Sequence, residues 1–345
     1  MKQVSIYNTL EFEKVRRELN IDSQSIRKLR NALFKHFRSD ESALREVPVG
    51  DRLVLHHLKQ ASRHDSQIDG ATKLLFRTAT ENLIEAVILR ITSGRTTLCV
   101  SSQVGCAAAC DFCATGKMGI ARNLSAEEIC DQVLHAGQIL AEEGRVIRNI
   151  VFMGMGEPFH NEEQLYTAIE ILIASQTFHF SPAKMLVSTV GIPEAMLRCA
   201  RRFPQVNLAL SLHSVSQPTR ERLIPLAAKY PLEELKATLR KINALQGKPV
   251  MIEYLMLAGV NDSNESAHAL VEWLSGLDTH VNLIPYNPIE DAPHLQGTER
   301  VGRERFAEIL KQANLPTTIR YSLGADIAAA CGQLVRKENR THTRA

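Results

Sequence analysis

The chain has 345 residues, of which 44% are hydrophobic and 23% charged, and its formal net charge is +3. This composition is that of an ordinary globular protein with enough chain for one large core or two modest ones. The N-terminus is amphipathic and mixed in charge, and no apolar run reaches the roughly 18 residues of a membrane span. We therefore expect no signal peptide, no membrane contact and a cytoplasmic location, where thiols stay reduced.

Residues 1–75 have helical spacing, as in Leu29, Leu33 and Phe37, and no strand signal, so they predict a small helical domain. Residues 1–70 hold the whole net charge, with 13 Lys and Arg against 10 Asp and Glu, whereas the remainder has 28 of each. Five cations follow one another without an acid: Arg27, Lys28, Arg30, Lys35 and Arg38. They form either the phosphate-facing patch of an RNA-binding accessory domain or a solvated helix face, and the charges alone favour the second.

Residues 76–95 predict connecting strands, because the stretch 73–90 resembles two short strands, and a regular alternation of strands and helices begins at Thr96. One helix is marked by a capping box of Ser125 and Glu128 and an apolar face of Ile129, Val133, Ala136 and Leu140. Seven apolar runs predict strands: 96–102, 149–154, 184–190, 206–212, 250–257, 281–286 and 317–322.

This alternation with short links predicts a parallel sheet in an α/β fold. Polar and glycine-containing motifs follow most strands, which favours a partial (β/α)6 barrel over a doubly wound sheet. We expect this core to span residues 96–325 and to be followed by a C-terminal segment, 326–345, with a basic tail.

Three of the seven cysteines lie within eight positions, as Cys106, Cys110 and Cys113. An odd number of cysteines in a long chain argues against a disulfide framework. Structural zinc normally takes four protein ligands, and no second cysteine pair is present. Three thiolates on a 4Fe-4S cluster leave one iron without a protein ligand, and an external ligand can bind there.

The CxxxCxxC loop after the first core strand resembles the radical S-adenosylmethionine (SAM) superfamily, whose open iron binds the amino and carboxylate groups of SAM. The chain is more closely similar to the RlmN/Cfr family of RNA adenine methyltransferases. The similarity runs from about Leu83 to Leu334 through "TLCVSSQVGCAAACDFCATG", "NLSAEEICDQV", "FMGMGEP", "LSLHS", "IEYLMLAGVND", "NLIPYNP" and "AACGQL".

The resemblance implies roles for three residues outside the cluster motif. Cys331 would be methylated first, and Cys99 would form a transient disulfide with it. Glu85, an acid inside an apolar strand, would be the base. Without the resemblance, Cys331 and Cys99 are expected to be buried structural thiols and Glu85 to face water. Cys130 and Cys199 match no family motif and are expected to be structural.

The family's SAM contacts correspond to residues near the ends of the predicted strands. Glycine permits close backbone approach, and a carboxylate can accept from an ammonium or a ribose hydroxyl. The alternatives are a tight turn for the glycine motif and a structural role for the histidine. The expected SAM-binding residues are Gly156, Glu157, Ser188, Ser211, Leu212, His213 and Asn287.

The implied reaction uses two SAM molecules, because carbon 2 of adenine is electron-poor and resists polar methylation. One SAM methylates the thiolate of Cys331 by displacement. The second, reduced by the cluster, gives a 5′-deoxyadenosyl radical that takes a hydrogen from that methyl group. The resulting radical adds to the base, the ring proton is removed, and Cys99 attacks the sulfur of Cys331 to release the product.

The resemblance therefore implies a radical SAM methyltransferase that acts on carbon 2 of an adenosine in the peptidyl transferase centre of 23S rRNA, with tRNA as a further candidate substrate and an electron donor such as flavodoxin. We expect it to be a monomer. Ala328, Leu226 and Ala227 depart from the family pattern and leave the RNA substrate open. One alternative is methylation of carbon 8, the Cfr-type outcome. Another is an iron-sulfur or zinc RNA-binding protein without catalysis.

Overall fold

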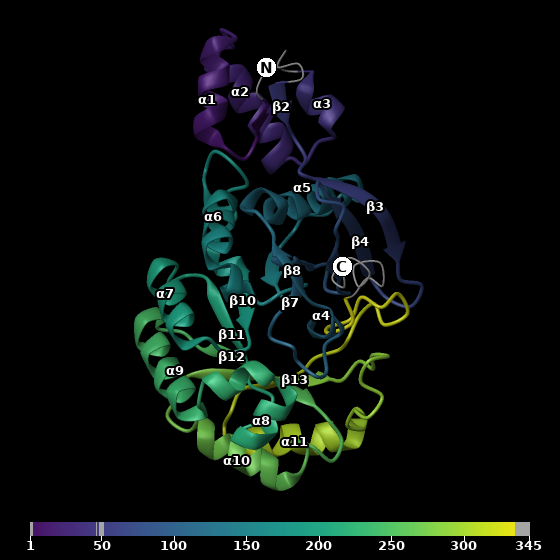
Figure 1. The fold of residues 1–345 in the computed structure, drawn as a ribbon, viewed down its shortest axis with the longest axis vertical. Coiled ribbons are helices and arrows are strands. Elements are labelled where there is room, and N and C mark those ends of the chain that lie inside the picture. The colour runs from purple at the N-terminus through teal and green to yellow at the C-terminus, as the bar shows by residue number, and fades with distance from the viewer. Residues whose placement is uncertain (1–2, 46, 48–51, 335–345) are drawn as a thin grey trace.

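The computed structural model describes residues 3–45, 47 and 52–334 of the chain (Figure 1). The basic tail predicted after residue 334 lies outside the described residues. No helix within the described part of the chain is both long and apolar enough to cross a lipid bilayer.

A ten-stranded sheet forms the centre of the protein, with the order β14-β13-β12-β11-β10-β9-β6-β5-β4-β3. Each of the seven runs predicted as strands is a strand of its parallel part: β6 (Thr96–Cys99), β9 (Asn149–Phe152), β10 (Met185–Thr189), β11 (Asn207–Ser211), β12 (Val250–Met256), β13 (Thr279–Pro285) and β14 (Thr317–Ile319). A doubly wound sheet reverses its strand order at a switch point. The order from β6 to β14 does not reverse, as expected for a partial barrel.

The parallel strands are linked by α5 (Ala126–Glu142), α6 (Glu162–Ile173), α7 (Pro193–Arg202), α9 (Leu232–Gln246), α10 (Asn264–Leu274) and α11 (Arg300–Gln312), with the short α8 (Gln217–Leu223) before α9. Figure 1 shows α6, α7, α9 and α10 following one another around the outside of the molecule. The capping box at the start of α5 is confirmed, and all four residues of its predicted apolar face are buried.

Three antiparallel strands extend the sheet from β6: β5 (Leu83–Arg90), β4 (Ala71–Thr78) and β3 (Leu58–Asp65). The two strands predicted within 73–90 are confirmed as β4 and β5. The prediction that residues 1–75 contain no strand is wrong, because β3 lies within that range. Its single buried residue is Leu58, and an edge strand that is exposed on both faces has no alternating pattern to recognise.

The N-terminal helices are α1 (Thr9–Glu18), α2 (Ser23–Arg30), the π-helical turn Asn31–Lys35 and α3 (Asp40–Leu44). A parallel pair of two-residue strands, β1 (Val4–Ser5) and β2 (Leu53–Val54), closes this unit. Leu29 and Leu33 are buried, as their spacing predicts. The last α-helix described in the N-terminal unit, α3, ends at Leu44, about thirty residues before position 75.

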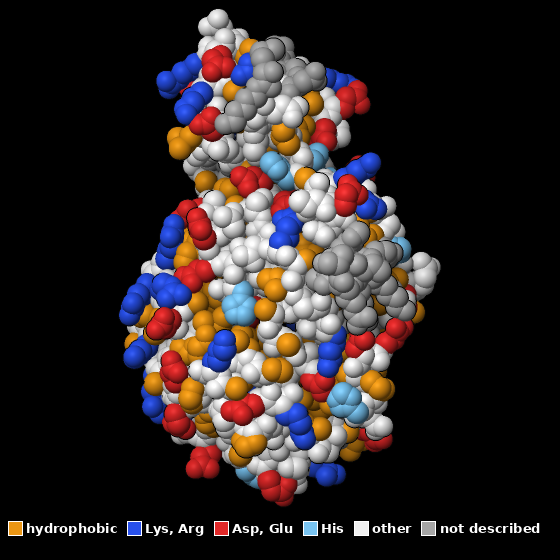
Figure 2. All heavy atoms as spheres, viewed as in Figure 1, with side chains coloured by type: hydrophobic (Ala, Val, Ile, Leu, Met, Phe, Trp, Pro, Cys, Tyr) orange, Lys and Arg blue, Asp and Glu red, His pale blue; other side chains and the backbone are white. Residues whose placement is uncertain are grey.

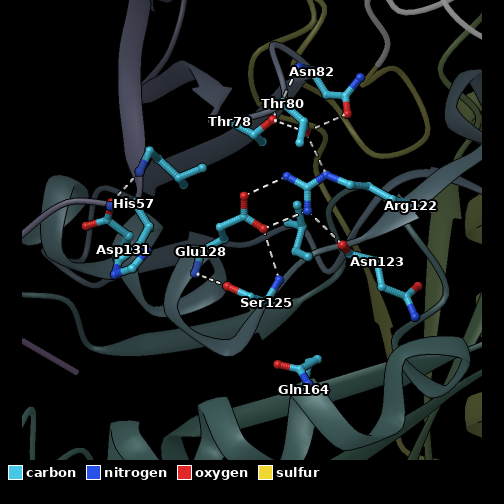
Figure 3. A network of polar contacts seen from close by, with 12 residues as sticks. His57, Thr78, Thr80, Asn82, Arg122, Asn123, Ser125, Glu128, Asp131 and Gln164 are labelled. Atoms are coloured by element: carbon cyan, nitrogen blue, oxygen red, sulfur yellow. Dashed lines mark hydrogen bonds and ion pairs between the residues drawn. The ribbon is translucent and has the colours of Figure 1, made fainter. Parts of the chain in front are cut away.

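The N-terminal unit is joined to α5 through the buried carboxylate of Asp131. Asp131 Oδ1 accepts a hydrogen bond from the hydroxyl of Tyr7 at 2.8 Å. Its Oδ2 accepts from the backbone amides of His57 and Leu58 at 2.7 and 2.8 Å. Figure 3 shows the contact between Asp131 and His57. A charged acceptor that binds several donors fixes the chain just before β3 against the core helix.

Candidate active site

A cavity of about 500 Å³ brings together ten of the thirteen residues predicted for the site. Its walls come from β5, from the parallel strands, from the cysteine loop after β6 and from the segment after β14. The ten residues are Cys99, Cys106, Cys110, Cys113, Gly156, Glu157, Ser188, Ser211, His213 and Cys331. Glu85, Leu212 and Asn287 do not line the cavity and are described separately below.

The three clustered cysteines lie on a small hairpin. Cys106 ends β7 (Gln103–Cys106), which pairs with β8 (Gly119–Asn123), and Cys113 is the N-cap residue of α4 (Ala114–Lys117). Gly105 has φ +78°, and a Cβ there would lie 1.9 Å from the carbonyl oxygen of Gly119. The hairpin therefore requires glycine at this position.

Arg122 anchors the hairpin to the core (Figure 3). Its guanidinium donates to both carboxylate oxygens of Glu128 on α5, at 2.8 and 2.6 Å, and to the hydroxyl of Thr80 in the β4–β5 turn at 3.0 Å. Glu128 also closes the capping box with Ser125. A bidentate arginine–carboxylate pair has a fixed geometry, so the cysteine loop is held in one orientation.

The spacing of the three thiols bears on which metal centre they fit. A single tetrahedral zinc holds its sulfur ligands within roughly 4 Å of one another. Among the described residues, His56, Asp131 and His135 have ligand atoms that all lie within 4.8 Å of one another. The sulfur atoms of the three cysteines do not meet this distance criterion. A cluster that takes one thiolate on each of three irons suits this wider arrangement.

Cys99 is the last residue of β6, and Cys331 lies more than 230 positions later in the chain, yet both face the same cavity. All seven cysteines are free thiols in the structure, so the predicted disulfide between Cys99 and Cys331 is not formed. Desolvation by the surrounding protein raises the pKa of Cys99 to about 12. Cys331 is an exposed residue rather than the buried one expected without the resemblance, and its pKa is raised, with desolvation of the thiol as the largest cause. The guanidinium of Arg320 opposes both shifts.

The segment that carries Cys331 is hydrogen-bonded to the cysteine loop. The amide of Ala114 donates to the carbonyl oxygen of Gly332 at 2.7 Å, and the hydroxyl of Thr115 donates to that of Leu334. Asn287, which lies outside the cavity lining, donates from Nδ2 to the carbonyl oxygen of Cys331 at 3.1 Å. These contacts hold Cys331 beside the cluster motif and give Asn287 a positioning contact within the site.

Glu85 is buried on β5, and strand alternation places it on the same face as Val87 and Leu89, which line the cavity. The expectation from composition alone, that Glu85 faces water, is wrong: it is 1% exposed. Its carboxylate lies 3.7 Å from the ammonium of Lys73, which also donates to the carbonyl oxygen of Ala328 at 3.3 Å. Glu85 is thus connected through Lys73 to the segment that carries Cys331.

Glu157 and Gly156 follow β9. The carboxylate of Glu157 accepts from the backbone amides of Phe159 and Val190 at 3.1 and 2.9 Å. Burial raises the pKa of Glu157 to about 7. Gly156 has φ +107°, and a Cβ there would lie 2.7 Å from Cβ of Gln103. Gly156 therefore permits the segment after β9 to approach β7 closely, and it also lines the cavity.

His213 is buried after β11 with φ +58°. Its Nδ1 accepts from the amide of Leu255 at 3.0 Å, so the neutral ring carries its proton on Nε2. Burial, followed by the charge of Arg220, lowers the pKa of His213 to about 3. The side chain of the neighbouring Leu212 is fully buried in the main hydrophobic core, which argues against a role for this side chain in SAM binding.

Three charged residues of this region were not predicted from the sequence. Arg320 and Glu253 line the cavity, and the amide of Asn282 donates to Glu253 Oε2 at 2.8 Å. Arg220 lies on α8 behind the cysteine loop and is fully buried. Glu253 and Arg320 each lie within an apolar run that predicts a strand. A charged residue in such a run was the sequence signal that could have identified them as site residues.

The radical SAM superfamily model matches residues 100–271, the part of the chain that contains the cysteine loop and most of the parallel sheet. A probable RNA methyltransferase from Rhodopirellula baltica is 59% identical over 337 residues, which cover 98% of this chain and 89% of that protein. A probable dual-specificity RNA methyltransferase RlmN from Thermus thermophilus is 44% identical, with 80% of this chain and 77% of that protein covered. The chain belongs to the RlmN family of radical SAM RNA methyltransferases.

A solved structure agrees with this assignment. The crystal structure of a radical SAM methyltransferase from Sphaerobacter thermophilus superposes with a TM-score of 0.89 at 38% identity and covers 96% of this chain and 98% of that one. As an RlmN family member the protein is a SAM-dependent methyltransferase, and the superfamily implies a 4Fe-4S cluster together with SAM.

Proposed function

We propose that this protein methylates carbon 2 of an adenosine in the peptidyl transferase centre of 23S rRNA, and an adenosine of tRNA as a second substrate. The observation that carries the proposal is the presence of Cys99, Cys331 and the three-cysteine loop around one cavity. The name dual-specificity RNA methyltransferase, borne by relatives such as that of Thermus thermophilus, supports more than one RNA substrate.

Cys106, Cys110 and Cys113 would hold the cluster, and Gly156, Glu157, Ser188, Ser211 and His213 lie where they can contact SAM. The reduced cluster and SAM supply a radical able to abstract hydrogen from a methyl group. A flavodoxin-type protein is the electron donor that we propose. His213 can only donate, through Nε2, because the amide of Leu255 occupies Nδ1.

Cys331 and Cys99 have different tasks in this proposal. Cys331 accepts a methyl group as a thiolate and carries it to the base, a displacement that the positive charge of Arg320 favours. The thiolate of Cys99 then attacks the sulfur of Cys331: a disulfide forms, the bond between that sulfur and the methylene carbon breaks, and this carbon takes a proton to become the methyl group of the product. Their common cavity supports this division, because the two thiols must meet once in each turnover.

Glu85 is the base that we propose for the ring proton. Its side chain lies 3.7 Å from the ammonium of Lys73, and a carboxylate at this position can accept a proton from a base bound in the cavity. Lys73 also contacts the carbonyl oxygen of Ala328, so the pair is linked to the segment that carries Cys331.

Mass spectrometry of nucleosides from 23S rRNA and tRNA, incubated with the reduced enzyme and SAM, tests the proposal. We expect 2-methyladenosine, accompanied by one S-adenosylhomocysteine and one 5′-deoxyadenosine for each methyl group. The product 8-methyladenosine would establish the carbon 8 alternative. If the intact enzyme cleaves SAM but leaves both RNAs unmodified, the proposed RNA substrates are wrong. The Cys331→Ala protein is the negative control for RNA methylation.

A further inference from the structure

Arg220 is a fully buried arginine on α8 that the proposed reaction does not use. Its Nη2 donates a hydrogen bond to the carbonyl oxygen of Val190. Its Nε and Nη1 are buried and have no hydrogen-bond partner among the described residues. A guanidinium offers five N–H donors, so most of the hydrogen-bonding capacity of this side chain is unused within the protein.

Within the part of the chain that the structure describes, no carboxylate forms an ion pair with Arg220. Glu157 is separated from it by Val190, whose amide donates to the carboxylate while its carbonyl oxygen accepts from the guanidinium. An unpaired charge is costly to bury, so its presence indicates a counter-charge that the protein atoms do not supply.

The cysteine loop lies directly beside α8. The amide of Asp111 donates to the carbonyl oxygen of Leu223 at 2.9 Å. Leu223 and Ile224 pack in one hydrophobic cluster with Cys106 and Cys110. Arg220 does not line the cavity, so its charge acts on the cysteine loop through the intervening protein.

Three thiolates on an oxidised 4Fe-4S cluster give one net negative charge, and reduction adds a second. We propose that Arg220 is the counter-ion of this cluster and raises its reduction potential from behind the cysteine loop. The inference rests on the assignment of the cluster to Cys106, Cys110 and Cys113. A fixed positive charge stabilises the reduced cluster more than the oxidised one, because the reduced form is more negative.

A redox titration of the reconstituted full-length enzyme, followed by electron paramagnetic resonance without SAM or RNA, measures the effect. We expect Arg220→Met to lower the midpoint potential of the cluster by at least about 59 mV. For a one-electron couple this shift is a tenfold change in the ratio of oxidised to reduced cluster. Arg220→Lys, which retains the charge, should lie closer to the wild type. Arg30→Met is the matched control, because Arg30 also has buried unpartnered nitrogens but belongs to the N-terminal unit.

Thermal unfolding of the iron-free proteins separates this role from a structural one. Without the cluster the charge of Arg220 is uncompensated, so apo Arg220→Met should be at least as stable as the apo wild type. Marked loss of apo stability in both Arg220→Met and Arg220→Gln would assign Arg220 to the support of Val190 instead.

An unchanged midpoint in Arg220→Met would overturn the inference, even if SAM affinity changed. If the assignment of the cluster to the three cysteines were wrong, a different measurement would show it: the Cys110→Ala protein would keep its iron.

Discussion

The carboxylate of Asp326 accepts a hydrogen bond of 2.8 Å from the hydroxyl of Ser66, although 260 positions separate the two residues. Its second oxygen accepts from the amide of Gln67 at 2.9 Å. The turn also supplies an acceptor to the same segment, because the carboxylate of Asp69 accepts from the amide of Gly324 at 2.8 Å. The turn between β3 and β4 therefore holds the start of the segment that leads to Cys331.

Removal of the Asp326 carboxylate should loosen that segment. We expect Asp326→Ala to increase the rate at which maleimide alkylates Cys331 severalfold, because the turn no longer holds the segment against the core. Peptide mass spectrometry after short exposures measures the rate. Glu308→Ala is the control, since the side chain of Glu308 accepts a hydrogen bond from Gln312 on its own helix, α11. Equal alkylation of Asp326→Ala and wild type would contradict a positioning role.

The cluster assignment predicts a joint loss of iron and SAM cleavage. Replacing any one of Cys106, Cys110 and Cys113 by alanine should lower the iron content after anaerobic reconstitution and abolish formation of 5′-deoxyadenosine. Cys199→Ala removes a buried thiol on α7 and should retain both properties. Full SAM cleavage by Cys110→Ala would refute the assignment.

The proposed division of tasks between Cys331 and Cys99 predicts two different failures with the cluster intact. Cys331→Ala should accept no methyl group on the protein and leave the RNA unmodified. Cys99→Ala should still be methylated at Cys331 and should then trap the RNA covalently, because no thiol can attack the sulfur. Denaturing gels with labelled RNA detect the adduct. Normal turnover by Cys99→Ala would rule out the resolving role.

RNA binding by the N-terminal unit can be tested through its salt dependence. Of the five predicted cations, Arg27, Lys28, Lys35 and Arg38 are exposed, whereas Arg30 is partly buried with its guanidinium 5.2 Å from the centre of the Phe12 ring. The basic patch therefore has four members at most. Figure 2 shows acidic side chains interspersed with the basic ones on this unit.

Replacing those four exposed cations by alanine should weaken RNA binding and reduce the salt slope by about 0.7 to 0.9 for each phosphate that is no longer neutralised. SAM cleavage without RNA should not change. Point substitutions are preferable to deletion of residues 1–70, since β3 belongs to the central sheet. The control replaces four exposed cations on α7, α9 and α11: Arg201, Arg240, Lys241 and Lys311. Equal salt slopes for both sets would identify the patch as a solvated face.

The attachment of the N-terminal unit should depend on pH through His56. Burial opposes the charge of this ring, but hydrogen bonds to Asp131 and Asp40 outweigh burial and raise its pKa to about 10. Because the folded pKa exceeds the usual 6.5, the stabilisation is complete below pH 6.5 and declines as the pH rises toward 10. His135 has a lowered pKa, because it is buried, and remains neutral over this range.

Thermal unfolding between about pH 7 and pH 10 checks this expectation. The wild-type midpoint should fall by a few degrees across the range, whereas His56→Gln should start lower and vary less with pH. His268→Gln, on the exposed side of α10, should follow the wild type. Parallel curves for His56→Gln and wild type would show that His56 carries no stabilising charge.

Local patterns in the amino-acid sequence were enough to predict the parallel strands, the helix that follows the capping box and the metal-binding loop. Each depends on residues close together in the chain: apolar runs of strand length, Ser125 with Glu128, and three thiols within eight positions. The strand β3 was missed for the same reason, since an exposed edge strand lacks a local hydrophobic pattern.

Which distant residues share the site was decided by the folding of the whole chain. Cys99, Glu157 and Cys331 meet because closure of the sheet and the return of the last segment bring separate strand ends together, and no local pattern encodes these distances. Arg220 and Arg30 are ordinary helical arginines in the sequence. Only packing shows that both have buried guanidinium nitrogens and that Arg220 lies behind the cysteine loop, because burial is a property of the assembled chain.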